Sequence, residues 1–430
     1  MVDIHTKIDY NFYKGRYYYM KKKTLLEKYA ELAVKVGVNV QEGQLVFVNS
    51  STDNNILARK IVEQAYLAGA SKVVMNWSDD YVSKSGYEYR DIESLSTIPD
   101  YSVEKYKDFI KKNGCSISIK SPVPNLNKDI DPKKLQAASI ATRKALSFYY
   151  DHMMASRSPW LVIAAPNVVW AETVFPNLEG QAAIDELWDA IFSASRVTEN
   201  NNPIEEWKLH NERISKHNKL LNDYNFDELK FKNSLGTDIS VKLVENHIWA
   251  GGGELDPRGI LFNPNIPTEE CFTMPHKYGV NGKVVGTKPL LYQGKLIEDF
   301  WIEFKDGKVS NYDAGKNKDA LDNLVNFDEG SCRLGEIALI SYDSPISNSG
   351  ILFYNTLFDE NASCHMALGR AYVINVVGGD NLSAKEKDEV GCNHSMAHSD
   401  FMFGSSDLSV IGVMKDGKEV TVFENGNFII

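Results

Sequence analysis

Cysteine is scarce in this chain of 430 residues, and none of its five cysteines stands in a CxxC pair. An odd number of isolated cysteines supports neither a disulfide framework nor a zinc ribbon, which favours a reducing compartment. No apolar run approaches the roughly 20 residues that a membrane helix needs, and the N-terminus lacks a basic segment followed by a hydrophobic one. These absences predict a cytoplasmic protein without a membrane partner.

Sequence signals for nucleic acids and nucleotides are also missing. The formal net charge is −11, from 47 basic and 58 acidic residues, and no long block of one sign forms a basic stripe for a nucleic-acid backbone. Neither GxGxxG nor GxxxxGK followed by Ser or Thr comes after any predicted strand. We therefore expect no nucleic-acid partner. We also expect the first domain to support the active site or to form a wall that contacts the substrate, rather than to bind a nucleotide.

The chain does contain enough apolar residues for more than one core. Hydrophobic residues make up 43% of it and aromatic residues 11%, which indicates a globular protein of two or three domains. Residues 1–19 are polar and rich in tyrosine, and helical patterning begins only at Met20. We therefore expect a poorly ordered extension over residues 1–19, with Met20 as an alternative start.

The first half alternates helical and strand patterns. After a helix over residues 25–36, the strand GQLVFVNSS, a helix that ends near Gly69 and the strand SKVVMNW predict a βαβ unit. The alternation continues through the strands CSISIK and PWLVIAA, with a helix opened by Asp131 and Pro132 between them. The pattern predicts an α/β domain over residues 20–205 with a mainly parallel sheet.

The second half has short strands instead. A long polar helix follows Pro203, and turn signals such as VNGK and ENGN then separate strand-like segments. The segment EDFWIEFKDGKV alternates Phe300, Ile302 and Phe304 with charged residues, as a half-buried strand does. We place a domain boundary near residue 205, followed by a hairpin-rich α+β domain over residues 206–430.

Acidic residues and histidines of the second half lie among apolar neighbours in the segments IPTEECFTMPH, LGEIALIS, LFDENASCHMALGRAY and HSMAHSDFMFG. Such buried charges either satisfy one another or hold a ligand. On an extended chain, His398 and Asp400 leave the same face. On the helix that we expect after Glu360, His365 and Tyr372 share one face.

A pair of divalent cations would explain this density, because carboxylates bridge two cations and imidazoles complete each shell. Mixed oxygen and nitrogen ligation without thiolate favours Zn²⁺, Co²⁺ or Mn²⁺ over calcium. Simpler explanations stay open at this point: a satisfied core network, or Glu269 and Glu270 as the first turn of a helix capped by Thr268. A dyad of Cys364 and His365 is disfavoured, because adjacent side chains point in different directions.

The same segments resemble the M29 family of metallo-aminopeptidases. The resemblance is carried by NIPTEECFTMPH, VVGTKPLLYQGKLIEDFWIEF, DEGSCRLGEIALISYDSPIS, GILFYNTLFDENASCHMALGRAY and AHSDFMFG, and with the pattern from Met20 it covers nearly the whole chain. It implies a homodimeric exopeptidase with a catalytic C-terminal domain that removes N-terminal amino acids from peptides with a free N-terminus. It also implies two divalent ions per subunit, namely zinc, cobalt or manganese, with magnesium as a further candidate.

The resemblance also implies the site residues. Glu270 matches the glutamate of the PTEE segment and is chosen over Glu269 by its spacing to Glu336. We expect Glu336 to bridge the two metals, and Glu360 to be a ligand or the base for a metal-activated water. We expect Tyr372 to bind a metal or to stabilise the tetrahedral oxyanion. The expected ligands are Glu270, Glu336, Glu360, His365, Tyr372, His398 and Asp400.

Two other functions stay open. A metal-dependent hydrolase of phosphate esters would need cationic contacts near the metals, for which the local sequence offers little beyond Lys277, Lys288 and Arg370. A non-enzymatic protein with a buried polar network would have a stability that chelators leave unchanged. Within the family resemblance, His394 is not expected to be a ligand.

Overall fold

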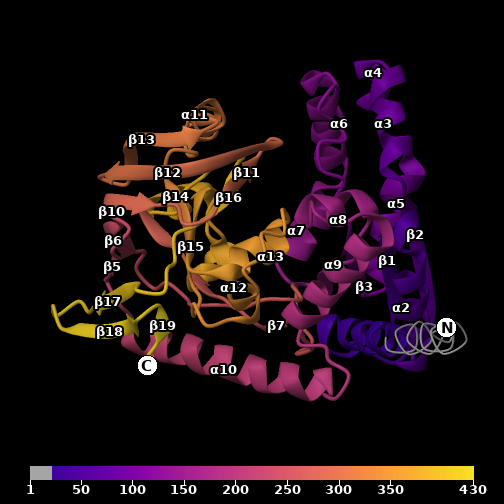
Figure 1. Cartoon of the computed structure of the whole chain (residues 1–430), viewed down its shortest axis with the longest axis horizontal. Helices are drawn as coiled ribbons and strands as arrows, with labels where there is room; N and C mark the ends of the chain where they lie inside the picture. The colour runs from indigo at the N-terminus through magenta and orange to yellow at the C-terminus, as the bar shows by residue number, and fades with distance from the viewer. Residues whose placement is uncertain (1–21) are drawn as a thin grey trace, which may run out of the picture. The chain divides into compact units, whose positions relative to one another are not determined.

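The computed structural model of the chain describes residues 22–430, so the predictions for residues 1–19 and for a start at Met20 lie outside the described residues. The chain divides into two compact units, and many of their helices and strands are labelled in Figure 1. The first unit comprises the described residues up to Leu209 together with Gly253–Ile266. The second unit comprises His210–Gly252 and Pro267–Ile430.

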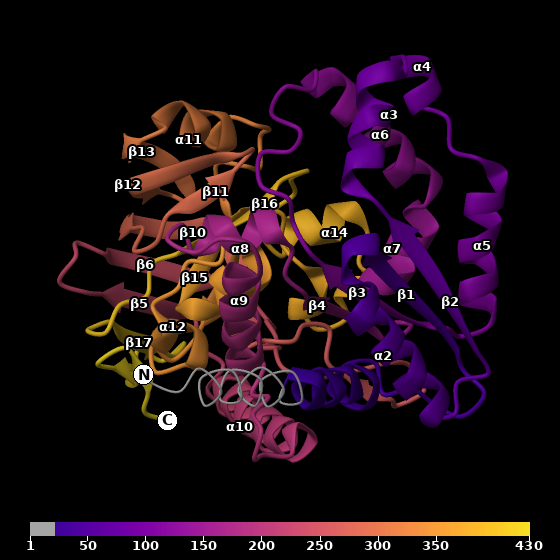
Figure 2. The same cartoon turned by 45° about the vertical axis from the view of Figure 1, so that its right-hand side comes forward.

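The first unit contains a four-stranded sheet with the order β2-β1-β3-β4 (Figure 2). Its strands are β1 (Leu45–Ser51), β2 (Lys72–Ser78), β3 (Cys115–Lys120) and β4 (Trp160–Ala164). Every neighbouring pair is parallel, and α2 (Asn55–Leu67) connects β1 to β2. The predicted βαβ unit and the parallel sheet are confirmed.

Helices account for most of the remaining first unit. Residues 22–32 are helical and continue as a π-helix over Ala33–Gly37. The other helices are α3 (Asp80–Tyr89), α4 (Ile92–Leu95), α5 (Asp100–Lys111), α6 (Pro132–Ala145), α7 (Ser147–Met154), α8 (Val168–Val174) and α9 (Gly180–Ala194). The carboxylate of Asp131 caps α6 by accepting a hydrogen bond from the Lys133 amide, and Pro132 occupies its first turn, as the sequence predicts.

A later segment of the chain returns to the first unit. It carries the short hairpin of β7 (Glu254–Leu255) and β8 (Leu261–Phe262). Beyond it, the Val162 amide donates to the Pro264 carbonyl at 2.7 Å, and the Ile266 amide donates to the Val162 carbonyl at 3.1 Å. These bonds extend the sheet beside β4, a long-range pairing that sequence periodicity did not reveal.

The second unit contains a nine-stranded antiparallel sheet, with β13 paired to β12 and the order β11-β12-β10-β6-β5-β17-β18-β19. Its strands are β5 (Glu228–Lys232), β6 (Asp238–Leu243), β10 (Pro275–Val285), β11 (Leu290–Tyr292), β12 (Lys295–Lys305), β13 (Lys308–Lys316), β17 (Ser409–Val413), β18 (Glu419–Glu424) and β19 (Asn427–Phe428). Phe300, Ile302 and Phe304 are buried along β12, which confirms the predicted alternation. The antiparallel, hairpin-rich character of this region is likewise confirmed.

A smaller antiparallel sheet lies in the same unit, with the order β16-β15-β14-β9. Its strands are β9 (Cys271–Thr273), β14 (Leu334–Leu339), β15 (His365–Gly369) and β16 (His398–Met402). The helix predicted over the segment of His365 and Tyr372 is wrong, because His365 begins β15 and Tyr372 follows this strand in an irregular stretch. All five residues of β15 are buried, so polar residues do not alternate with apolar ones, and the short apolar run cannot be told from a buried helix by periodicity.

The remaining helices are α10 (Pro203–Tyr224), which spans the division between the units, α11 (Lys318–Val325), α12 (Pro345–Ser349), α13 (Thr356–Asp359) and α14 (Ala384–Glu389). The long polar helix predicted after Pro203 is therefore confirmed as α10. Within residues 22–430, no helix combines the length and the apolar character needed to cross a bilayer.

Candidate metal centre

The small sheet brings four of the expected ligands onto one face. Ala367, in the middle of β15, pairs with Glu336 on one side and with Asp400 on the other. Because side chains alternate along a strand, His365 leaves the sheet on the same face as Ala367. His398, two residues before Asp400 on β16, also leaves on that face. The methyl group of Ala367 takes little space, so the four larger side chains can converge above it.

The atoms of this cluster form two triads that share Glu336. The Nε2 atom of His365 lies 3.5 Å from Glu336 Oε1 and 3.4 Å from Glu270 Oε2. The Nε2 atom of His398 lies 3.6 Å from Glu336 Oε2 and 3.3 Å from Asp400 Oδ1. In each triad, one ligand atom from each of the three residues lies within 4.8 Å of the others. The two oxygens of Glu336 therefore face different triads.

Local contacts decide which of two adjacent glutamates joins the cluster. Glu270 directly precedes β9, in which Phe272 pairs with Ala338 of β14, and Ala338 in turn pairs with His365. Because Glu270 is two residues before Phe272, its side chain leaves on the same face as His365. Glu269 points elsewhere, with its Oε2 atom 3.8 Å from His210 Nε2, and its amide donates to Asn361 Oδ1 at 2.8 Å. No helix begins here, so the alternative of a capped first turn at Thr268 is wrong.

A glycine permits the close approach of the backbone at Glu270. Gly251 has a φ of +138°, and a Cβ atom added to it would lie 2.0 Å from the Glu270 carbonyl oxygen. Any larger residue at this position would therefore push the Glu270 backbone away. The chain before β9 thus depends on Gly251 to keep Glu270 in place.

Backbone carbonyls orient both imidazoles. His398 Nδ1 lies 2.8 Å from the Arg370 carbonyl oxygen, and His365 Nδ1 lies 3.4 Å from the Ser363 carbonyl oxygen. A carbonyl oxygen can only accept a hydrogen bond, so each Nδ1 donates. In the neutral imidazole, the Nε2 lone pair then faces the carboxylates, which is the usual arrangement of a metal-binding histidine.

The protein alone balances the charges of this cluster poorly. Burial raises the pKa of Glu336, and burial followed by the charge of Asp400 raises the pKa of Glu360 well above its usual range. Although burial lowers the pKa of His398, the carboxylate of Asp400 raises it to about 10. Burial also lowers the pKa of His365, yet its hydrogen bonds to Glu270 and Glu336 raise this pKa well above the usual range. Four carboxylates face two imidazoles, so cations would relieve the excess negative charge.

The two remaining expected residues lie beside the triads. Glu360 begins a 3₁₀ turn, Glu360–Ala362, that directly follows α13, and it lines a cavity together with Asp400. The ring of Tyr372 lies 4.7 Å from the ring of His398, centroid to centroid. Burial raises the pKa of the Tyr372 phenol, and the nearby charge of Glu336 raises it further, so the hydroxyl keeps its proton. Tyr372 can therefore donate a hydrogen bond at the edge of the cluster.

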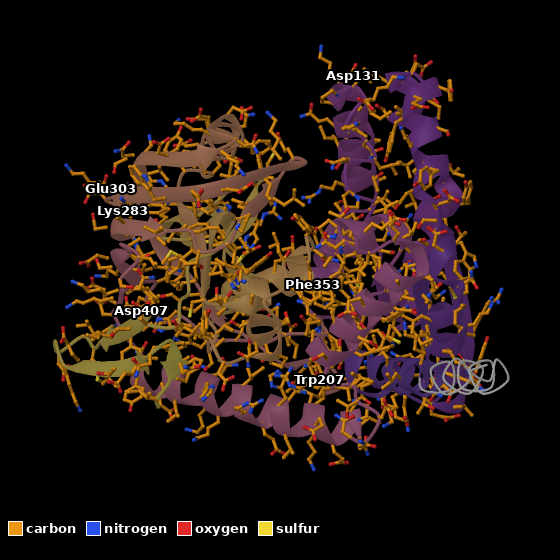
Figure 3. The ribbon with its side chains drawn as sticks, in the orientation of Figure 1. Asp131, Trp207, Lys283, Glu303, Phe353 and Asp407 are labelled. Atoms are coloured by element: carbon orange, nitrogen blue, oxygen red, sulfur yellow. The ribbon has the colours of Figure 1, made fainter. Side chains whose placement is uncertain are left out.

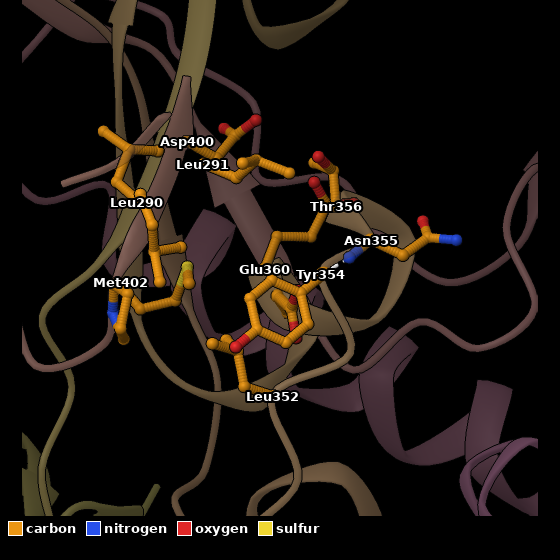
Figure 4. Close-up of a pocket in the computed structure, with 12 residues that line it drawn as sticks. Leu290, Leu291, Leu352, Tyr354, Asn355, Thr356, Glu360, Asp400 and Met402 are labelled. Carbon is orange, nitrogen blue, oxygen red and sulfur yellow. Dashed lines mark hydrogen bonds between the residues drawn. The ribbon is translucent and has the colours of Figure 1, made fainter. Parts of the chain in front are cut away.

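The cavity beside Glu360 and Asp400 is mostly apolar, and about 40 Å³ of its space can hold the centre of a water-sized sphere (Figure 4). Its apolar lining consists of Pro289, Leu290, Leu291, Leu296, Leu352 and Met402. Tyr354, Asn355, Thr356 and Asp359 complete the wall. The cavity therefore joins a carboxylate-rich end to an apolar end.

Other candidates from the sequence lie apart from this chemistry. Lys277 pairs with Asp388, and the Nε atom of Arg370 donates to the Ser395 carbonyl at 3.3 Å. Burial raises the pKa of the Cys364 thiol to about 12, so Cys364 is not a thiolate nucleophile. His394 is exposed and belongs to neither triad.

Sequence reasoning missed two buried residues that shape the site. The side-chain oxygen of Asn361 accepts a hydrogen bond from the Glu269 amide. The carboxylate of Asp359 accepts hydrogen bonds from two backbone amides of the preceding loop. Both are neighbours of Glu360 in the DENAS segment. The density of polar residues in this segment was the sequence signal that could have identified them.

A family model and several sequence relatives indicate one family. Residues 22–428 match the family model described as thermophilic metalloprotease (M29). The chain is 44% identical to aminopeptidase 2 of Geobacillus stearothermophilus over 403 residues, which cover 94% of this chain and 97% of that protein. It is 34% identical to aminopeptidase T of Thermus aquaticus, over 94% of this chain and 98% of that protein. The solved structure of wild-type AmpT from Thermus thermophilus is 33% identical, has a TM-score of 0.88, and covers 95% of this chain and 100% of that chain.

Proposed function

This chain belongs to the M29 family of metalloproteases, and from this membership we propose that it is a dinuclear aminopeptidase that hydrolyses peptides with a free N-terminus. The family match and the relatives named as aminopeptidases make the chain a peptidase that uses divalent metal. The proposal adds the number of ions, the residues that hold them, and the attack of water on the first peptide bond.

The observation that carries the proposal is the pair of triads that share Glu336. Glu270, Glu336 and His365 would hold one divalent ion, and Glu336, His398 and Asp400 would hold the other. This donor set of carboxylates and imidazoles without thiolate suits Zn²⁺, Co²⁺ or Mn²⁺, with Mg²⁺ as a weaker candidate.

Bound divalent cations supply Lewis-acid polarisation of the scissile carbonyl and make a water nucleophilic near neutral pH. Glu360 lies outside both triads but lines the same cavity as Asp400, so its carboxylate can accept the proton of the attacking water. The same carboxyl group then passes this proton to the leaving amine. Glu360 therefore acts as the general base and then as the general acid.

Tyr372 is suited to a different step. Its protonated hydroxyl, beside the ring of His398, can donate a hydrogen bond to the oxyanion that develops on the scissile carbonyl. The excess of carboxylates also favours a positively charged α-amino group on the substrate. An N-acetylated peptide lacks this charge and should be a poor substrate.

We propose further, from the family, that the protein acts as a homodimer in the cytoplasm. Size-exclusion chromatography with light scattering would measure the mass of the assembly. A monomeric mass at assay concentration would contradict the dimer.

The test of the proposed function is hydrolysis of unblocked and N-acetylated aminoacyl-p-nitroanilides by chelator-stripped protein, before and after addition of Zn²⁺, Co²⁺, Mn²⁺ or Mg²⁺. We expect cleavage of the unblocked compounds alone, restored by metal, and two bound ions per subunit by elemental analysis. One ion per subunit at full activity would refute the dinuclear centre. Failure with every metal, together with cleavage of p-nitrophenyl phosphate, would favour a hydrolase of phosphate esters instead.

A further inference from the structure

Tyr354 has an unusual backbone conformation for a bulky residue. Its φ is +53°, in the left-handed region where the Cβ atom of most residues contacts the backbone unfavourably. Tyr354 also lines the cavity that contains Glu360 and Asp400. Strained conformations of this kind persist only where the surrounding structure holds them, and they cluster at functional sites.

The carboxylate of Asp359 holds the strained turn from both sides. Its Oδ1 atom accepts a hydrogen bond from the Phe353 amide at 2.7 Å, and its Oδ2 atom accepts one from the Asn355 amide at 2.9 Å. Tyr354 lies between these two amides. Asp359 is only 8% exposed, so the two bonds lie largely away from water. The backbone on either side of Tyr354 is thus fixed by one buried side chain.

Aromatic packing next to Tyr354 also stabilises the turn. Phe353, labelled in Figure 3, is fully buried and stacks on Phe358 with ring centroids 4.5 Å apart and an interplanar angle of 16°. Phe358 belongs to α13, the short helix that ends at Asp359 and leads directly into Glu360. The turn that carries Tyr354 is therefore coupled to the segment that carries Glu360.

The wall opposite this turn is apolar except for Asp400. In the close-up, Tyr354 lies beside Glu360 and Leu352, whereas Leu290 and Met402 form the other side of the cavity (Figure 4). Of the described residues that line the cavity, none is cationic, and the acidic ones are Asp359, Glu360 and Asp400. An acidic side chain would meet like charge here, whereas an uncharged apolar side chain would bury surface against leucine and methionine.

We propose that this cavity receives the side chain of the substrate's N-terminal residue, and that Tyr354 is the residue that limits its size. The proposal rests on the aminopeptidase function proposed above. It specifies the substrates as peptides whose first side chain is apolar and no larger than leucine or methionine. Asp359 is a positioning residue, because it acts on the substrate only by holding Tyr354 in place.

The test compares unblocked p-nitroanilides of alanine, leucine, phenylalanine, tryptophan and glutamate with the metal-loaded enzyme. In the wild type, we expect leucine to be preferred and glutamate to be the poorest. Tyr354→Gly removes the ring and accepts the left-handed conformation without strain. This variant should raise kcat/KM for tryptophan relative to leucine at least tenfold. Tyr354→Phe keeps the wall and should keep the wild-type order.

A matched control distinguishes the loss of the Tyr354 ring from the relief of left-handed backbone strain. Asp306 has a similar φ of +49° in the turn between β12 and β13, and it does not line the cavity. Asp306→Gly should therefore leave the substrate order unchanged. If Tyr354→Gly folds poorly, Tyr354→Asn gives the same comparison, because asparagine adopts the left-handed region readily.

Asp359→Asn tests the positioning role. An amide offers one oxygen in place of two, so the turn should lose one of its two anchors. We expect KM for the leucine substrate to rise more than kcat falls, and the discrimination between leucine and tryptophan to shrink towards that of Tyr354→Gly. Adding Asp359→Asn to Tyr354→Gly should change this ratio little, because both act on the same wall. A lower melting temperature with the wild-type ratio would mean that Asp359 is only structural.

The outcomes separate the two proposals. An active wild type whose leucine to tryptophan ratio survives Tyr354→Gly would overturn the role of Tyr354 and leave the aminopeptidase function standing. A wild type that cleaves none of the unblocked compounds with any metal would overturn both. Inhibition by free leucine and free tryptophan provides a second readout, because the ratio of their inhibition constants should shift in the same direction as the kcat/KM ratio.

Discussion

Two sheets of this protein carry buried or partly buried polar side chains, and they satisfy these side chains in different ways. In the parallel sheet of the first unit, the Asn76 side-chain amide donates to Asn49 Oδ1 at 2.8 Å, and Asn49 Nδ2 donates to Ser116 Oγ at 3.0 Å. In the small sheet of the second unit, the carboxylates of Glu336 and Asp400 face imidazoles within 3.6 Å. The first network consists of amides and hydroxyls, with the Lys105 ammonium donating to Asn76 Oδ1 at its edge, whereas the second contains several carboxylates.

The two networks differ in whether they need a bound cation to balance them. Amide and hydroxyl groups are both donors and acceptors, so the network around Asn49 is completed by the protein itself. Ionised carboxylates only accept, and the two histidines in the triads cannot neutralise all of them. A buried cluster that the chain leaves electrically incomplete is therefore the stronger indication of a bound cation.

The largest effect should come from the residue that both triads share. Glu336→Gln keeps the shape but removes the charge between His365 and His398. We expect kcat/KM to fall by more than the roughly 10- to 100-fold typical for an outer partner of a metal ligand. The melting temperature should stay near that of the wild type, because a neutral group is easier to bury. A variant that keeps most of the wild-type kcat with saturating metal would refute the shared role.

Glu269 and Glu270 are adjacent in the chain but lie in different surroundings, so substitutions at the two positions test the site assignment. Glu270→Gln should lower kcat/KM and weaken metal binding, because Glu270 lies 3.4 Å from His365. Glu269→Gln should cost much less activity, because Glu269 faces His210 instead. Kinetics and metal titration of the two variants would measure the difference. Equal losses in both would contradict the assignment of Glu270.

Removal of metal should affect the two sheets unequally. A chelator would leave the carboxylates of the second unit facing one another, so the amides of β14, β15 and β16 should exchange hydrogen faster. The amides of β1 and β3 should keep their protection, because the side-chain network of Asn49 and Asn76 contains no carboxylate that a metal ion would neutralise. Hydrogen exchange with mass spectrometry of the loaded and stripped protein measures both. Equal loss of protection in both sheets would mean that the ions stabilise the whole chain and not the cluster.

The smallest effect should come from breaking the amide network of the first unit's sheet. Asn49→Leu removes the acceptor of the Asn76 amide and the donor to Ser116, which should cost about 1–3 kcal/mol of unfolding free energy. The kcat/KM of the folded protein should not change, since the first unit's sheet contributes no ligand to either triad. Chemical denaturation and a peptidase assay on the same preparation would test this. A large loss of activity at full folding would show that the two regions are coupled.

Local pattern was enough for much of the fold. The strands of the first unit and the alternation in β12 follow directly from periodicity and turn residues. His398 and Asp400 could be placed on one face because two residues on a strand always share it. His365 was misplaced on a helix, because the fully buried β15 lacks alternation. Within the site, family motifs named the residues, but they left the choice between Glu269 and Glu270 to spacing alone.

The sequence by itself determined the secondary-structure alternation, the family, and the residue types that could bind a cation, because these depend on neighbours along the chain. Only the tertiary structure decided that Glu336 lies between two histidines, since this requires the registers of β14, β15 and β16. The turn of Tyr354 was likewise decided there, because its strain is balanced by a buried carboxylate and by packing between Phe353 and Phe358. Strand register and strain are set by contacts across the fold, so periodicity along the chain does not contain them.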